Sequence, residues 1–506
     1  MEIELLRETT RYFKRIFNAA VTSELGAECV VPDDCPEAGE VYLAEGCALL
    51  KGKEASAGVL SVRGSVKLSV LYASGADGAL SRLETETPFA VETACGDADE
   101  NCRLSAGCAL ASCEVRRLTS RKLYLRLEIL TELECWKEDE LLLRCLPAGE
   151  NPDLEQKIRK EQILAAQSIT ERSFVVTDEI RLGGEKKPAS EILLYSARLE
   201  QEPPQSVGSK LIVKGTAEIG ILYRSVDGEV CRTQAETEFS QIMETDVAGS
   251  DRAEVRLALT GVIVNPELSL SPEERTILAE LHIAAQCAAY VQLETEWLQD
   301  AYAIAVPAMI GREEIEISVP GSRRQLTAQI SGSVPSAGGN GNVLYAAARC
   351  GKFEIAGEPG ARELRGTVEV AALSVSDGVL RAGTARIPVL EPCEPEEDAV
   401  LGAGTAEIFA AGTPEGAEIR GRVTIPALEH SARREDAVTS LRLDESARRD
   451  PRDFPSLILR RCGEGDTLWE IAKSAGSTET LVIAANDLDP GEALPCGKLL
   501  ILPRRR

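Results

Sequence analysis

The chain has 506 residues, with 82 acidic and 56 basic side chains and a formal net charge of −26. One hydrophobic core does not support this length, so we expect several domains. The acidic excess argues against nucleic acid as a partner, because phosphate binding requires clustered Lys and Arg. The first residues, Met1-Glu-Ile-Glu, lack the order of a secretory signal, and no apolar run approaches the roughly 18–20 residues that span a bilayer. These features predict a cytoplasmic protein.

Cysteine is abundant and histidine is scarce, with 15 cysteines and only two histidines, His282 and His430. Thiols stay reduced in the cytoplasm, so we expect most of these cysteines to act as small core residues. The chain has no C-x-x-C pair, and we therefore expect neither a metal site nor a cofactor. Cys462 and Cys496 are the one pair that antiparallel outer strands could bring together.

Apolar residues near the N-terminus recur at the three-to-four-residue spacing of an amphipathic helix. They are Leu5/Leu6, Tyr12/Phe13, Ile16/Phe17 and Ala20/Val21. A second, more polar stretch, Leu154–Gln167, shows a similar spacing. We predict a helix in each stretch, the second connecting two domains.

Three segments share one pattern: a basic residue, glycine, a small residue and then alternating apolar positions. Their glycines, Gly64, Gly215 and Gly366, are 151 residues apart each time. An Asp-Gly turn follows each segment, at 77–78, 227–228 and 377–378. Alternation indicates half-buried strands, and Asp-Gly supplies the positive φ of tight hairpins. We predict a mainly β protein with three tandem β-sandwich or barrel-like repeats.

The equal spacing divides the chain into five parts. The predicted parts are the N-terminal helix with repeat 1 (1–150), the connecting helix with repeat 2 (151–306), repeat 3 (307–430), a flexible linker (431–455) and a C-terminal module (456–506). Repeat 3 is the most divergent and has Ser374 where the others have Tyr72 and Tyr223. The linker is charged and poor in apolar residues, which is typical of disordered segments.

The C-terminal module reads as strand, helix, helix and strand, a βααβ order. The first helix is capped by Asp466 or Thr467, and the second ends near Asn486, a residue that tolerates a left-handed position. The run Gly465-Asp-Thr-Leu-Trp-Glu-Ile-Ala472, then Asn486, then Gly497-Lys-Leu-Leu-Ile-Leu-Pro503 resembles the LysM domain over nearly its full length.

The LysM resemblance implies a glycan site. LysM modules usually bind N-acetylglucosamine-containing glycans in a groove between two loops. The matching positions here are Gly465, Asp466, Thr467, Leu468, Ala485, Asn486, Asp487 and Leu488. Trp469 lies beside them, either as a cover over the core, which we favour, or as a sugar platform. For a protein partner, Trp469, Leu488 and Leu494 are the expected anchors.

The order of repeats, linker and LysM resembles the SPOCS-repeat spore coat morphogenetic proteins of clostridia, the SipL-like group. That resemblance implies a protein of the mother-cell cytoplasm that associates with the forespore surface and takes part in coat assembly. It also implies that the LysM grips a protein, the coat-basement morphogenetic ATPase.

Catalytic motifs are missing from the sequence, and two histidines outside any motif make a Ser-His or Cys-His nucleophile a poor hypothesis. We therefore expect a non-catalytic scaffold for spore coat or envelope assembly. The alternatives are a protein that binds a peptidoglycan- or chitin-type glycan and, less favoured, a LysM-anchored wall hydrolase.

Overall fold

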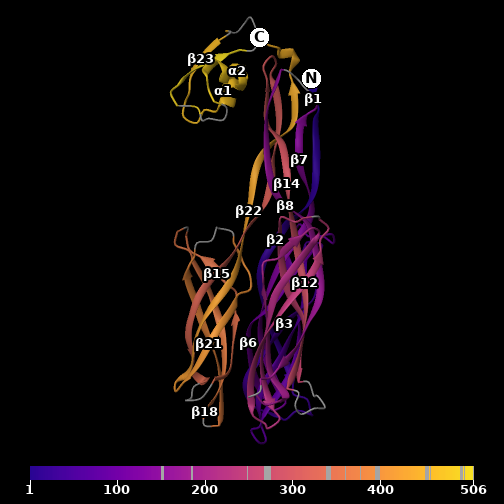
Figure 1. Ribbon diagram of the computed structural model, residues 1–506, viewed down its shortest axis with the longest axis vertical. Helices are drawn as coiled ribbons and strands as arrows, with labels where there is room; N and C mark the ends of the chain where they lie inside the picture. The colour runs from indigo at the N-terminus through magenta and orange to yellow at the C-terminus, as the bar shows by residue number, and fades with distance from the viewer. Residues whose placement is uncertain are drawn as a thin grey trace.

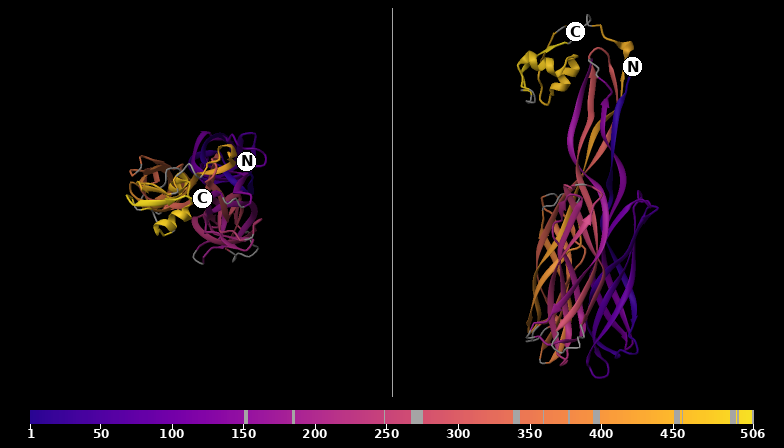
Figure 2. Two further views of the ribbon diagram at one scale, coloured as in Figure 1. Left: turned by 90° about the horizontal axis from the view of Figure 1, so that it is seen from above. Right: turned by 45° about the vertical axis from the view of Figure 1, so that its right-hand side comes forward.

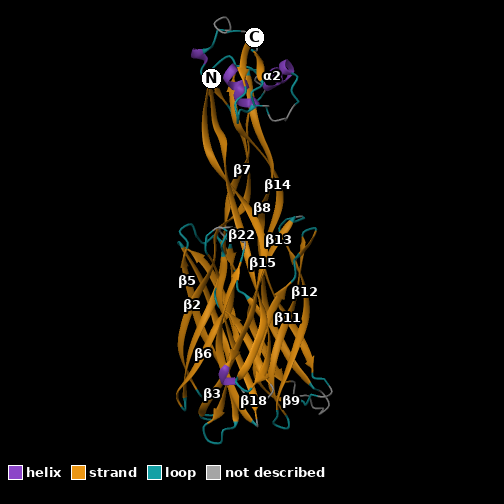
Figure 3. Ribbon diagram, turned by 90° about the vertical axis from the view of Figure 1, so that its left-hand side faces the viewer, coloured by secondary structure: helices purple, strands orange, loops and turns teal. Residues whose placement is uncertain are grey.

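The computed structural model describes most of the chain. The described residues are 1–149, 153–183, 186–247, 249–266, 275–337, 343–358, 360–376, 378–393, 399–450, 455, 457–489, 494 and 496–504. Strands dominate, and the only α-helices in these ranges, α1 (Leu468–Ala475) and α2 (Glu479–Asn486), lie near the C-terminus (Figure 3). The expectation of a mainly β fold is confirmed. None of the described helices is long and apolar enough to cross a membrane.

Three β-sandwiches lie side by side at one end of the elongated molecule (Figures 1 and 2). The first contains β2 (Leu5–Val30), β3 (Ala38–Ser56), β4 (Val59–Ser74), β5 (Leu80–Ala94), β6 (Arg103–Thr119) and β7 (Lys122–Pro147). β2 pairs with β7 and β7 with β6, while β4 is the central strand between β3 and β5. The apolar faces of these two layers meet in one core that includes Val66, Leu68 and Leu125.

The same order of pairing occurs twice more. The second sandwich contains β8 (Leu154–Arg181), β9 (Ala189–Gln201), β10 (Gln205–Val207), β11 (Lys210–Ser225), β12 (Val230–Glu244), β13 (Arg252–Pro266) and β14 (Thr276–Ala303). The third contains β15 (Ala308–Val334), β16 (Val343–Cys350), β17 (Glu354–Ala356), β18 (Glu363–Ser376), β19 (Val379–Pro392), β20 (Val400–Leu401), β21 (Thr405–Thr413) and β22 (Gly416–Leu443). In each, the first long strand pairs with the last, the last pairs with the strand before it, and β11 or β18 takes the central place of β4.

The long strands β2, β7, β8, β14, β15 and β22 extend beyond the sandwiches and form a stalk (Figure 1). Apolar side chains of all three strand pairs share its interior, among them Tyr12, Trp297 and Ala437. The chain turns at the tip between β7 and β8 and again between β14 and β15. The N-terminal β1 (Glu2–Ile3) pairs with the end of β22, so both ends of the first 443 residues lie at the tip.

The predicted N-terminal and connecting helices are wrong, because these residues form β2 and β8. β2 pairs with β7 from Leu5 to Val30, and aromatic and β-branched residues favour this extended backbone. In the middle of β2 the apolar doublets lie on a strand that packs on both faces, whereas Leu6 near its start is exposed. Tyr12 packs into the stalk interior, whereas its neighbour Phe13 packs beside Trp136.

The predicted flexible linker is also partly wrong. Residues 431–443 form the end of β22, paired with β15, and a short 3-10 helix, Glu445–Ala447, follows. Val438, Leu441 and Leu443 are buried in the stalk, which is narrow enough for a few apolar residues to fill it. Residues 451–454 and 456 of the predicted linker lie outside the described residues.

The three glycines of the sequence pattern occupy matching places. Gly64, Gly215 and Gly366 lie on the central strands β4, β11 and β18, and a phenylalanine ring covers each one. The rings are those of Phe89, Phe239 and Phe353, each closer than a Cβ atom would tolerate. The hairpin glycines that follow, Gly78, Gly228 and Gly378, all have positive φ, of 70°, 84° and 77°. Asp377 of the third turn lies outside the described residues.

Three buried hydroxyl groups also match. Tyr72 donates a hydrogen bond to the carbonyl of Pro36 (3.0 Å), and Tyr223 donates one to Lys187 (3.1 Å). Ser374 takes the same place in the third sandwich and donates to Ala337 (2.7 Å). The smaller side chain therefore keeps the hydrogen bond that the tyrosines make.

Replacing Gly215 with valine is expected to destabilise the second sandwich by roughly 1–3 kcal/mol, because the new side chain would overpack a filled site. Its Cβ would lie 2.7 Å from the Phe239 ring and even closer to the Glu200 carbonyl oxygen. Gly183→Val is the matched control, since a Cβ there meets nothing within 4 Å. Urea unfolding of both variants measures the difference, and equal midpoints would contradict the close packing.

Candidate functional site

The C-terminal module is a small α/β unit at the tip of the stalk (Figure 1). Its strands β23 (Leu457–Arg461) and β24 (Leu499–Pro503) pair antiparallel, and the two helices lie between them in sequence. Ile471, Ala472 and Val482 from the helices pack against Leu500 and Leu502 in its core. The predicted βααβ order is confirmed.

The first loop is held by its own polar residues. Thr467 caps α1, its hydroxyl accepting a hydrogen bond from the Glu470 N–H (3.2 Å). The Asp466 carboxylate instead accepts from the Gly463 N–H (2.9 Å) and from Arg460 (3.2 Å). Gly465 has φ +83°, a conformation that favours glycine. Gly465 and Thr467 are exposed, whereas Asp466 and Leu468 are half-buried.

The second loop is tied to β24 by Asn486. Its side-chain amide donates to the Ile501 carbonyl and accepts from the Ile501 N–H, both at 2.6 Å. The left-handed residue after α2 is Asp487 (φ +49°) and not Asn486, because the Asn486 side chain serves this tie from within the helix. Asp487 is exposed, Ala485 is half-buried, and Leu488 packs against the same core cluster as Leu468.

Trp469 turns away from a free surface and packs on the stalk. It is buried, its indole Nε1–H donates to Asp300 Oδ2 (2.7 Å), and its ring meets Tyr302 edge-on with centroids 4.8 Å apart. Ile304 completes this apolar contact. The expectation that Trp469 anchors an external partner is corrected here, because β14 already occupies that face. The sequence carried no signal for this contact, since the partners are nearly 170 residues apart.

The contact between module and stalk, which we call the seat, is centred on Asp300. The carboxylate also accepts from Lys473 Nζ (2.7 and 3.0 Å) and Arg312 (2.7 Å). Beside it, the Tyr302 hydroxyl donates to the Ser477 carbonyl (2.9 Å). Burial raises the pKa of Asp300, but hydrogen bonds from Lys473 and Trp469 outweigh it and hold the pKa below its ordinary value.

The outer face of the two-stranded sheet is apolar and exposed. Leu457, Leu459, Leu499 and Ile501 are 51%, 58%, 57% and 37% exposed. The register sets Leu459 opposite Ile501, and alternation puts all four on the side away from the helices. Arg461 lies opposite Leu499 on this same side. We call these five residues the outer face.

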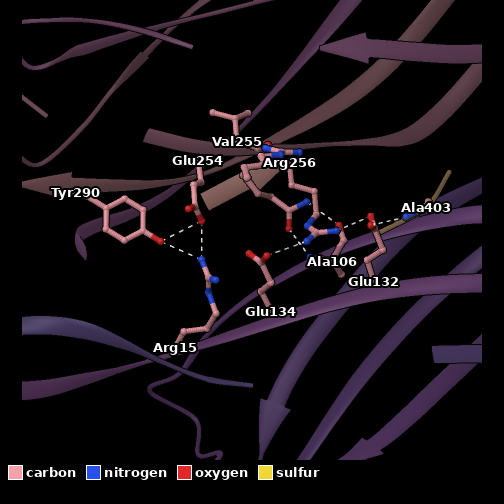
Figure 4. Close-up of polar contacts among 11 residues, drawn as sticks. Arg15, Ala106, Glu132, Glu134, Glu254, Val255, Arg256, Tyr290 and Ala403 are labelled. Carbon is pink, nitrogen blue, oxygen red and sulfur yellow. Dashed lines mark hydrogen bonds and ion pairs between the residues drawn. The ribbon is translucent and has the colours of Figure 1, made fainter. Parts of the chain in front are cut away.

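A second polar centre lies where the sandwiches meet, in a cavity of about 1060 Å³ (Figure 4). Arg256 contacts Glu132 (2.5 Å) and Glu134 (3.1 Å), and Glu132 also accepts from the Ala403 N–H (2.7 Å). Nearby, Arg15 and Tyr290 both donate to Glu254, at 2.5 and 3.0 Å. These contacts come from all three sandwiches, so the centre joins them.

Metal binding finds no support in the described ranges, where no group of three or more His, Cys, Asp or Glu side chains is arranged to hold an ion. The fifteen cysteines all have free thiols.

Comparison with known families decides the nature of the module. Residues 463–503 match the LysM domain. The chain therefore ends in a LysM domain, which contains all nine site residues predicted from the sequence. LysM points to binding of glycans such as peptidoglycan. No curated protein and no solved structure matches the chain.

Replacing Asp300 with alanine is expected to loosen the LysM domain from the stalk by roughly 2 kcal/mol, since hydrogen bonds to a charged group are lost. Hydrogen–deuterium exchange should rise across 468–477 and 300–304. Asp436→Ala, an exposed aspartate on β22, is the control.

Acid should have the same effect on the wild type. Because the pKa of Asp300 is lowered in the seat, the seat is fully stabilised above the ordinary value of about 4 and weakens as pH falls through the lowered pKa. If hydrogen–deuterium exchange at 468–477 changes neither in Asp300→Ala nor in acid, the seat does not depend on this carboxylate.

Proposed function

We propose that the protein is a non-catalytic scaffold that holds its LysM domain at one end of a β-stalk and docks another protein there. The observation that carries this proposal is the outer face of the LysM sheet. Four exposed apolar side chains on one side of a two-stranded sheet form a surface suited to a protein partner.

The charge around the outer face indicates what the partner presents. Arg461 lies on the face, and Lys498 is exposed just before β24. An apolar patch with basic groups at its edge fits a protein that offers apolar side chains beside carboxylates. A glycan, in contrast, needs polar groups along a groove, and the outer face offers few.

The seat supports the same proposal. It removes Trp469 from any binding surface, whereas the two loops and the outer face stay accessible to a partner. Three strand pairs packed into one stalk hold the LysM domain at a set distance from the sandwiches. A fixed spacing between two interaction regions suits an assembly protein.

The three matching sandwiches also bear on the cellular role. We propose that they are copies of one unit and that they correspond to SPOCS repeats. On this proposal the protein acts in spore coat assembly at the forespore surface, and its partner is the coat-basement morphogenetic ATPase.

Glycan binding is the second candidate, supported by the LysM match itself and by the exposed Gly465, Thr467 and Asp487 in the two loops. The two candidates use different faces of one domain. Substitutions on the outer face leave the loops untouched and therefore separate them.

Leu459→Asp is expected to weaken capture of the protein partner by about tenfold or more, because a central apolar contact of the interface is lost. The experiment is a pull-down from sporulating cells with the full chain, the variant and a chain lacking 456–506. Leu118→Asp is the matched control, a leucine of similar exposure (52%) on the first sandwich.

Binding of the same proteins to chitin oligomers and peptidoglycan tests the alternative. Full partner capture by Leu459→Asp, or tight glycan binding that the outer-face change leaves intact, would overturn protein docking through this face.

A further inference from the structure

Cys102, Cys135 and Cys95 lie close together in the first sandwich, where nothing in the proposed function uses them. Cys102 directly precedes β6, and Cys135 on β7 is opposite Leu104. Alternation places Cys102 and Cys135 on the same side of this strand pair as diagonal neighbours. Cys135 and Cys95 belong to one buried cluster, and the Cys102 side chain packs against it.

The Cys102 and Cys135 thiols differ in access. Cys135 is fully buried (0% exposed), whereas Cys102 is half-buried. Cys102 lines a cavity of about 380 Å³ between the first and second sandwiches. A small molecule that enters the cavity can therefore reach Cys102 but not Cys135.

Asp99 holds the Cys102 thiol in place. The Asp99 N–H points at the sulfur (3.4 Å), and the thiol donates to the Asp99 carboxylate (3.6 Å), which pairs with Lys137 (2.8 Å). Attack on a disulfide requires the thiolate, and the Asp99 carboxylate is a neighbouring acceptor for the proton that the thiol gives up. Burial and the neighbouring Cys102 raise the pKa of the Cys135 thiol to about 12, so Cys135 is the slower nucleophile.

The charges around the cavity indicate the chemical class of its ligand. Lys53 and Arg103 supply cations, and Glu54, Glu100 and Glu171 supply carboxylates. Lys53 is paired with Glu171 (2.6 Å) and bonded to Gln286 (2.5 Å), which fixes its position. Mixed charge in a small cavity suits a molecule that carries both amino and carboxylate groups.

We propose that Cys102 is a thiol modification site for low-molecular-weight disulfides of the amino-acid type and that Cys135 resolves the product into an internal disulfide. In the first step the Cys102 thiolate attacks the reagent, forming a mixed disulfide and releasing one thiol of the reagent. In the second, Cys135 loses its proton and attacks the Cys102 sulfur, releasing the other thiol. Two protein thiols are oxidised, and one reagent disulfide is reduced to two thiols.

The test uses the full chain with Cys496→Ser, which removes the exposed thiol, and glutathione disulfide as the probe. Peptide mapping without reduction should show Cys102 and Cys135 cross-linked with the loss of two hydrogens. Cys135→Ala should instead accumulate glutathione on Cys102, and Cys102→Ser should show neither product. Circular dichroism and thermal melting establish that each variant is folded.

Cys393 is the matched control, a half-buried thiol outside this cluster. In the Cys496→Ser chain that keeps both Cys102 and Cys135, the cross-link must form faster than glutathione adds to Cys393. Equal labelling of Cys102 and Cys393, or no cross-link in that background, overturns the proposal even where a variant fails to fold.

Discussion

One buried guanidinium joins the third sandwich to the first. Arg349 on β16 contacts Glu369 of its own sandwich (3.1 Å) and Glu45 of the first sandwich (2.8 Å), and it donates to the Ala44 carbonyl (2.6 Å). All three charged side chains are less than 9% exposed. Removing one partner of such a group would leave an uncompensated buried charge, at a cost of about 3–5 kcal/mol. The third sandwich is therefore held to the first by buried charges as well as by apolar packing.

Sheet edges explain why polar side chains gather at these junctions. β6, β13 and β21 each pair with one strand only, which leaves a row of backbone groups facing a neighbour. In each case a side chain of another sandwich reaches that row: Lys67 donates to the Val262 carbonyl, Arg198 to the Ala406 carbonyl, and Glu369 accepts from the Cys113 N–H. The contacts run from the first sandwich to the second, the second to the third and the third to the first. A ring of this kind gives each of these three edges a polar partner from another sandwich without adding a strand.

The sequence predicted what local pattern and short spacing determine. Alternation and Asp-Gly turns indicated the hairpins around Gly64, Gly215 and Gly366, and the βααβ order of the C-terminal module followed from its caps and apolar spacing. The two false helices had a physical cause. In a strand buried on both faces, adjacent residues such as Tyr12 and Phe13 are both apolar, and doublets of this kind also match a helical period.

Long-range contacts could not be predicted in this way. Ser374 looked like the loss of a tyrosine, yet only the position of the Ala337 carbonyl shows that a shorter hydroxyl suffices. The nine LysM residues were found from their motif, but Asp300, which decides how Trp469 is used, lies in a strand with no motif of its own. Its role depends on the stalk bringing β14 to the module.

The seat gives the stalk its significance for function. A LysM domain without the seat could take many orientations, and a partner bound to it would be poorly placed relative to the sandwiches. Burying Trp469 against Tyr302 and Ile304, with Asp300 accepting three charged or polar donors, removes that freedom before any partner arrives. The LysM domain then loses its orientational freedom on folding. Partner binding at the outer face therefore does not carry that entropic cost. The same contact that takes Trp469 out of use thus leaves the outer face exposed at the tip of the stalk.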